Sequence, residues 1–310
     1  MKKKPSTETG IMHQKPLTPW MYLLPALIVM ATFIVYPAFN TFYLSVRNND
    51  NTGWAGTRCM DGQPCWGIFE NYRYALTSTI MQTAFLNNLK WILLMVSGTV
   101  AIGLLIAVLA DKVKYEPVAK TIIFLPMAIS FVGAGVIWKF MYNYGSSQVQ
   151  IGLLNAIITA FGGKPISWLT EPQINSIALI VVGVWMWTGF CMTILSAALK
   201  GVSVEILEAA RVDGASEWQV FWKITVPQIM PTITVVITTM VINVLKIFDI
   251  VYVMTGGNYG TEVIANRMYI EMYKNYDPGR ASAIAVILII VIIPVMIMNI
   301  RRFQKQEEIR

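Results

Sequence analysis

The sequence INSIALIVVGVWMWTGFCMTILSAAL occupies positions 174–199 and contains no charged side chain. An α-helix of about 20 mostly apolar residues is long enough to cross the hydrocarbon core of a bilayer. The core of a soluble domain does not need an uninterrupted apolar segment of this length. This stretch therefore predicts a membrane-spanning helix.

Five further stretches have the same character. The chain of 310 residues has 55% hydrophobic and only 13% charged residues, whereas a soluble domain has about 25% charged residues. The first stretch is much longer than the apolar region of a cleaved signal peptide, so we expect it to remain as a helix. We predict an all-α membrane protein with six transmembrane helices, the other five at positions 19–46, 91–110, 122–138, 224–245 and 281–300.

The net charge of +7 comes from basic residues that alternate with the predicted spans. One set of loops and tails carries Lys2, Lys3, Lys4, Lys15, Lys112, Lys114, Lys120, Lys200, Arg211, Lys223, Arg301, Arg302, Lys305 and Arg310. The positive-inside rule makes this the cytoplasmic side. Both termini are then cytoplasmic, as tails at 1–18 and 301–310 around a six-span domain at 19–300. The same distribution argues against a nucleic-acid partner.

Residues suited to catalysis are scarce. The single histidine, His13, lies in the predicted N-terminal tail, which removes histidine-based metal sites and nucleophilic triads from the membrane. The segment Gly162-Gly163-Lys164-Pro165 lacks the spacing of a phosphate-binding loop. We therefore predict no catalytic residue, no metal site and no cofactor bound by this chain.

Lys246 and Asp249 are the clearest charged residues near a span, at the outer end of the fifth. On a helix, residues three apart face one another, so these two are expected to form an ion pair rather than a proton relay. Cys191 lies inside the fourth span as a packing residue. Cys59 and Cys65 fall in the first outer loop, with a turn expected at Asp61-Gly62. Outside the cytoplasm we expect them to form a disulfide, with two free thiols as the alternative.

The predicted cytoplasmic loop at about 200–227 is rich in helix-forming residues. Ser203 suits an N-cap, and Glu205 then lies in the first turn, where a carboxylate favours the helix dipole. Gly214 can adopt the left-handed conformation that ends a helix. A second short segment at 216–224 leads to Pro227. We expect two short helices joined by a sharp bend and projecting into the cytoplasm.

The spacing in this loop resembles the signature of ABC importer permeases, especially the maltose type. The signature runs Glu-Ala-Ala, three residues, Gly, nine residues, Ile, one residue, then Leu and Pro, and this chain matches it except that Val226 replaces the usual Leu. The segments 20–26 and 248–257 are also similar to those permeases. In that family the loop docks on an ATPase. The resemblance implies coupling roles for Glu208, Ala209, Ala210, Asp213, Gly214, Ile224 and Pro227.

The same resemblance implies the fold of a type I ABC importer permease in a bacterial cytoplasmic (inner) membrane. It also implies four partners: a second permease forming a heterodimer, an ATPase dimer that binds ATP and Mg, an extracytoplasmic solute-binding protein, and a sugar. By position, the sugar would contact Gly183, Met186, Trp187 and Phe190 on the fourth span and Met240, Asn243 and Val244 on the fifth. Trp187 and Asn243 replace Gly and Phe of the maltose permease, so the pocket should differ.

Several alternatives stay open at this level. The seven residues assigned to the sugar could instead only pack between helices. Importers of glycerol phosphates or polyamines share the coupling loop, but their ligands need buried charges, which neither predicted face contains. An ion-coupled secondary transporter would work without an ATPase. A membrane enzyme is disfavoured by the missing catalytic groups.

Overall fold

The computed structural model describes residues 18–59, 65–111, 113–145 and 152–307, and within them nearly all regular structure is helical. The one β-bridge found there joins Arg47 and Trp54. The helices are α1 (Thr18–Met30), α2 (Tyr36–Ser45), α3 (Glu70–Thr77), α4 (Thr79–Trp91), α5 (Ser97–Ala110), α6 (Glu116–Phe124), α7 (Phe131–Met141), α8 (Leu153–Ala160), α9 (Asn175–Lys200), α10 (Val204–Val212), α11 (Glu217–Val220), α12 (Val226–Leu245), α13 (Asp249–Met254), α14 (Ile264–Tyr273) and α15 (Pro278–Glu307).

Five continuous helices are long and apolar enough to cross a membrane. They are Trp20–Ser45, Thr79–Ala110, Asn175–Lys200, Glu217–Leu245 and Pro278–Arg301. Three of them run through a π-helical turn, at Ala31–Val35, Ile92–Val96 and Phe221–Thr225, which joins the two α-helices on either side. The all-α membrane fold predicted from the apolar stretches is confirmed.

The predicted third span at 122–138 is not a straight helix. The chain bends by 98° between Glu116–Ala128 and Phe131–Met141, so the sixth crossing exists only if this pair counts as one span. Pro126 lies in the 3-10 turn Leu125–Ala128 at the bend, and proline offers no N–H to continue a helix. Ser130 then begins α7, because its side chain accepts a hydrogen bond of 3.1 Å from the Gly133 N–H.

The second and fifth spans begin earlier than predicted, at Thr79 and Glu217. In the second span the added turns contain Asn87 and Asn88, whose side chains are buried. Asn87 donates to the Gly260 and Glu262 carbonyls over 2.6 and 2.9 Å. Buried amides that find partners carry little penalty, which hydropathy alone does not reveal.

The core forms around α9, which packs closely against α5. A Cβ atom at Gly103 would lie only 2.8 Å from the Cβ of Cys191, so the absence of a side chain at Gly103 permits this approach. Cys191, Met192 and Leu195 are fully buried, which confirms that Cys191 is a packing residue.

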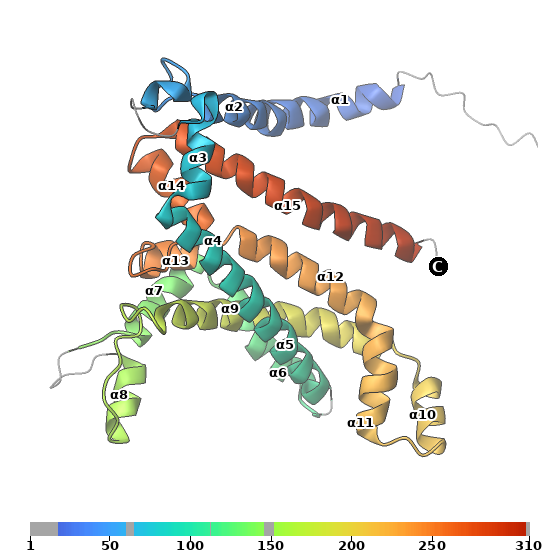
Figure 1. Cartoon of the computed structure of the whole chain (residues 1–310). Helices are drawn as coiled ribbons and strands as arrows, with labels where there is room; N and C mark the ends of the chain where they lie inside the picture. Colours follow the sequence, from blue (N-terminus) through green and yellow to red (C-terminus); the bar gives the residue numbers. More distant parts are fainter. Residues whose placement is uncertain (1–17, 60–64, 112, 146–151, 308–310) are drawn as a thin grey trace, which may run out of the picture.

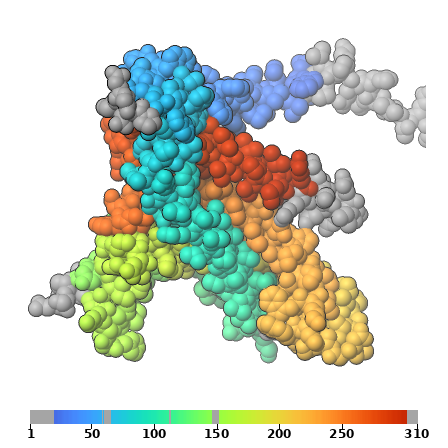
Figure 2. Space-filling view, in the orientation of Figure 1, coloured from blue at the N-terminus to red at the C-terminus, as the bar shows by residue number. Residues whose placement is uncertain are grey.

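The spans fan out from one end of the molecule, with α13 and α14 at that end and the spans spreading toward the other (Figure 1). The start of α1, the end of α15 and the α10–α11 pair lie on the same side, as an even number of crossings requires. We call this side the inner end; its cytoplasmic location remains a prediction. The N-terminal span and the α10–α11 pair project from the rest of the surface (Figure 2).

Candidate functional site

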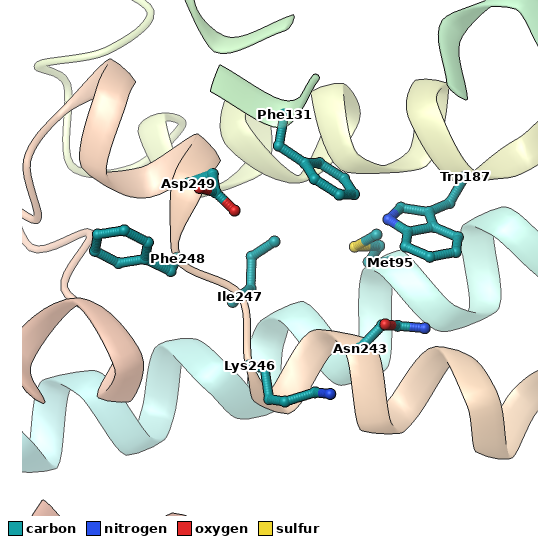
Figure 3. Close-up of a pocket in the computed structure, with 8 residues that line it drawn as sticks. All are labelled: Met95, Phe131, Trp187, Asn243, Lys246, Ile247, Phe248 and Asp249. Carbon is teal, nitrogen blue, oxygen red and sulfur yellow. The ribbon is translucent and has the colours of Figure 1, made fainter. Parts of the chain in front are cut away.

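A cavity of about 120 Å³ lies where α7, α9 and α12 meet (Figure 3). Its apolar lining is Met95, Phe131, Trp187, Ile247 and Phe248, and its polar lining is Asn243, Lys246 and Asp249. Most of these side chains come from the ends of helices or from the break between α12 and α13. The cavity therefore depends on where those helices stop.

Aromatic rings form one wall of the cavity. Trp187 stacks on Phe131 with ring centroids 5.9 Å apart and planes 28° from parallel. Phe190 also contacts Trp187 edge-on, with ring centroids 5.5 Å apart and planes at 88°. This packing holds the indole in one orientation. The wall therefore offers a fixed, flat apolar surface to a ligand.

Asn243 supplies a neutral polar group opposite that wall. Its Nδ2 donates a hydrogen bond of 3.0 Å to the Thr239 carbonyl one turn earlier. Its Oδ1 accepts no hydrogen bond from the described residues. An amide held by its own helix in this way leaves an acceptor for a ligand hydroxyl.

The expected ion pair between Lys246 and Asp249 is wrong. The helix ends at Leu245, residues 246–248 lie outside any helix, and α13 begins at Asp249. Without helical geometry the two side chains are no longer neighbours, and Figure 3 shows them on opposite sides of Ile247. Among the described residues no ion pair or hydrogen bond involves either charged group.

The structure brings together only part of the set assigned to the sugar from the sequence. Trp187 and Asn243 line the cavity, and Phe190 supports Trp187. The remaining four, Gly183, Met186, Met240 and Val244, are buried in the core. At Gly183 a Cβ would lie 2.9 Å from Met95 Sδ and from Trp91, so this glycine serves close packing.

Six lining residues were not in that set. Lys246 and Asp249 stand out in the sequence as charges beside a span, but their helical spacing predicts an ion pair. Met95, Phe131, Ile247 and Phe248 resemble any other apolar residue of a span and carry no sequence signal of their own. The expectation that the sugar-binding site contains no charged residue is therefore also wrong, since one basic and one acidic residue line the cavity.

The predicted coupling loop forms a helical hairpin at the inner end. Gly214 has φ +85° and follows the C-cap Asp213 of α10. The Gly214 N–H donates to Arg211 O and the Ala215 N–H to Ala210 O, each over 3.0 Å. These two bonds make a Schellman motif and confirm that Gly214 ends this helix.

The second half of the loop differs from the prediction. Ser216 caps α11 through a capping box, in which its Oγ accepts from the Gln219 N–H and Gln219 Oε1 accepts from the Ser216 N–H. The helix then continues through a π-helical turn into α12 without the separate short helix expected at 216–224. The capping interactions of Ser216 are local, whereas the continuity of the helix depends on packing within the membrane.

Ser203 occupies the expected N-cap position of α10, but its hydroxyl donates to the Glu205 carboxylate instead of accepting from the backbone. That hydrogen bond lowers the pKa of Glu205. Arg211 Nε contacts Glu217 Oε1 at 2.7 Å, and the hydrogen bond raises the pKa of Arg211. This ion pair links α10 to α11.

The residues predicted to couple lie mostly on the outside of the hairpin. Glu208, Ala209, Asp213, Gly214 and Pro227 are exposed. Ala210 and Ile224 are half-buried. Val212, beside Gly214, is 87% exposed, a large apolar exposure for a residue in water. The hairpin therefore presents small, apolar and charged groups that could contact another protein.

Cys59 and Cys65 are joined as a disulfide in the first outer loop, with their Cα atoms 5.6 Å apart. This separation lies within the usual range for a disulfide. The turn expected at Asp61-Gly62 lies outside the described residues. Glu70 lies nearby and accepts a hydrogen bond of 3.1 Å from the Trp66 N–H. It also forms an ion pair with Arg73, and the hydrogen bond from Arg73 is the main cause that lowers the pKa of Glu70.

Comparison with known proteins gives consistent matches over most of the chain. A family model described as "Binding-protein-dependent transport system inner membrane component" matches residues 99–304. The chain is 53% identical to the osmoprotective compounds uptake permease protein GgtC of Synechocystis sp., over 94% of this chain and 100% of the relative. It is 44% identical to the alpha-glucoside transport system permease protein AglF of Rhizobium meliloti, over 94% of this chain and 83% of the relative.

A solved structure shares the fold. The bacterial alginate ABC transporter, in complex with an alginate pentasaccharide-bound periplasmic protein, matches with a TM-score of 0.74 at 22% identity. The match covers 91% of this chain and 92% of that chain. At this identity the likeness concerns the arrangement of helices alone.

Proposed function

This chain belongs to the family of binding-protein-dependent transport system inner membrane components, and we propose that it forms the translocation path for a neutral glycoside. A member of this family is a multi-pass permease component of an ATP-driven importer and not an enzyme. The substrate, the partners and the residue roles that follow are the parts that we infer.

The observation that carries the substrate class is the stack of Trp187 on Phe131 beside Asn243. A sugar ring has an apolar face that packs on an aromatic ring and hydroxyls that hydrogen-bond to an amide. One relative is named for alpha-glucoside transport and another for uptake of osmoprotective compounds. One positive and one negative lining residue do not favour a phosphate or a polyamine over a neutral ligand.

The size of the cavity supports a second permease subunit. A cavity of about 120 Å³ is smaller than the roughly 300–1,000 Å³ of ordinary ligand pockets. A disaccharide therefore needs further wall. We infer that a second, non-identical permease supplies it, so that the sugar passes between two chains.

The other partners follow from the two ends of the chain. At the inner end, the exposed hairpin of α10 and α11 would dock on an ATPase dimer, which binds ATP and Mg. Glu208, Ala209, Ala210, Asp213 and Gly214 lie on α10 or directly after it, and Ile224 and Pro227 lie at the base. At the outer end, a solute-binding protein would deliver the sugar.

The test is uptake of a labelled α-glucoside into proteoliposomes that contain both permeases and the ATPase, with binding protein outside. We expect uptake that requires ATP inside the vesicles and that falls at least about tenfold in Trp187→Ala, because a buried aromatic contact is lost. Trp20→Ala, an exposed tryptophan at the start of the first span, should transport normally. Uptake that proceeds on an ion gradient without the ATPase would identify a secondary transporter instead.

A further inference from the structure

We propose that Lys246 and Asp249 act together as a charge filter that makes the cavity reject charged relatives of its neutral substrate. This inference rests on the proposed function and adds two specificity-determining residues to it. Lys246 and Asp249 line the same cavity from opposite ends of the break between α12 and α13.

The position of the two charges supports a role toward a ligand. Asp249 is half-buried and Lys246 is exposed at the cavity, and both line it beside Asn243. Figure 3 shows them on either side of Ile247, with Trp187 and Met95 across the cavity. A ligand that lies on the Trp187 ring therefore has both charges within its surroundings.

A purely structural role would be expected to pair these charges. In the described chain neither group forms an ion pair or hydrogen bond with protein, although a half-buried carboxylate gains stability from a partner. The helix break prevents the i, i+3 contact that would have joined them. The break thus keeps two opposite charges apart at the cavity.

The consequence is a lining whose charges cancel. A neutral polyhydroxy ligand can donate to the Asp249 carboxylate and accept from the Lys246 ammonium. A cationic analogue is repelled by Lys246 and attracted by Asp249, and an anionic analogue experiences the reverse, so neither gains a net attraction that would compensate for the loss of its hydration. Removing one of the two charges leaves the other uncompensated in a partly dehydrated space, where charge interactions are stronger than in water.

The two single substitutions therefore make opposite predictions. Lys246→Gln leaves a net negative lining and should favour an amino-sugar analogue. Asp249→Asn leaves a net positive lining and should favour a uronate analogue. The double variant restores neutrality, so its preference should fall between those of the two single variants.

The experiment uses the complete reconstituted complex and three labelled sugars of one scaffold: a neutral α-linked disaccharide, its amino-deoxy derivative and its uronate derivative. For each variant, the uptake ratio is the uptake of a charged sugar divided by the uptake of the neutral sugar. Dividing this uptake ratio by the wild-type uptake ratio removes the selectivity of the binding protein, which all variants share. We expect the two single variants to shift by at least about fivefold in opposite directions. Lys164→Gln and Glu171→Gln neutralise exposed residues outside the cavity and should leave both ratios unchanged.

Each outcome decides between the claims. Opposite shifts with an intermediate double variant support the filter. The filter is overturned by unchanged ratios, by no gain for either charged sugar, or by shifts in the same direction. Uptake of the neutral sugar by the wild-type complex would still support the proposed function in that case. Absence of neutral uptake by the wild-type complex overturns the proposed function, and the filter with it.

Discussion

The hydroxyl of Tyr74 donates a hydrogen bond of 2.6 Å to Oε1 of Glu271, across 197 residues of sequence. Arg267 pairs with the same carboxylate and its Nε donates to the Tyr74 hydroxyl over 3.1 Å. Glu271 is fully buried. This small network ties α3 to α14 at the end of the molecule opposite the inner end.

Removing the hydroxyl tests how much this tie stabilises the protein. Tyr74→Phe leaves a buried carboxylate with one partner fewer, and a hydrogen bond to a charged group contributes about 1.5–3 kcal/mol. We expect a lower melting temperature for the purified protein in detergent. The control is Tyr276→Phe, because Tyr276 is 77% exposed and this variant should melt as wild type does. Equal melting temperatures for the two variants would contradict a stabilising role.

The same carboxylate predicts a pH dependence. Burial opposes ionisation of Glu271, but hydrogen bonds from Tyr74 and Asn275 and the charge of Arg267 hold its pKa below the ordinary value. Its contribution is therefore complete above the ordinary pKa and is lost as the pH falls through the lowered one. In Glu271→Gln the melting temperature should fall less on acidification than in wild type.

Glu262 provides a comparison of opposite sign. Burial raises the pKa of Glu262, so its ionisation destabilises the folded state as the pH rises. Glu262→Gln should therefore lose more stability than wild type on acidification, and Glu271→Gln less. Melting curves at several pH values measure how the difference in melting temperature between each variant and wild type changes with pH. If this difference changes in the same direction for both variants, one of the two assignments is incorrect.

Asn243 is predicted to bind the sugar directly. Asn243→Leu removes the free acceptor from the cavity, and we expect transport to fall by about tenfold, the effect of 1.4 kcal/mol, while the complex still assembles. Thr238→Val is the matched control on the same helix, because the Thr238 hydroxyl bonds to the Thr234 carbonyl and does not line the cavity. Wild-type transport rates for Asn243→Leu would remove this residue from the site.

The hairpin of α10 and α11 is predicted to couple ATP hydrolysis to transport. A side chain at Gly214 meets no atom within 4 Å, so Gly214→Asp acts through its φ of +85°, at a cost of about 1–2 kcal/mol. We expect Gly214→Asp and Glu208→Lys to insert normally but to lose bound ATPase or ATP-driven uptake. Gly201→Ala, at a negative φ in the same loop, should retain both. Co-purification and uptake assays measure the two properties separately.

The Cys59–Cys65 disulfide predicts a simple mass difference. Protein purified without reductant and treated with an alkylating reagent should leave both cysteines unmodified, because they are joined to each other. Cys191 is buried and provides an internal thiol that reacts only after unfolding. Two alkylated residues at 59 and 65 in the folded protein would show free thiols.

The features that depend on local chemistry could be predicted from the sequence. The span predicted at 174–199 differs from α9 by one residue at each end, because burial of an apolar segment in a bilayer depends on its own residues. Gly214 ends α10 as expected, because the Schellman hydrogen bonds close within a few residues. The order of helices around the coupling signature likewise follows from one continuous stretch of chain.

The positions of the helix breaks, and the residues that those breaks bring together, could not be predicted in the same way. Pro126 lies in a 98° bend, although proline is tolerated inside α12 and α15. Lys246 and Asp249 have helical spacing in the sequence, yet the helix stops between them and turns an expected ion pair into two separate charges at a cavity. Met95 and Phe131 join that cavity from helices far away in the sequence. Such outcomes depend on packing among several spans, because each break exposes backbone groups that only neighbouring helices or a cavity can accommodate.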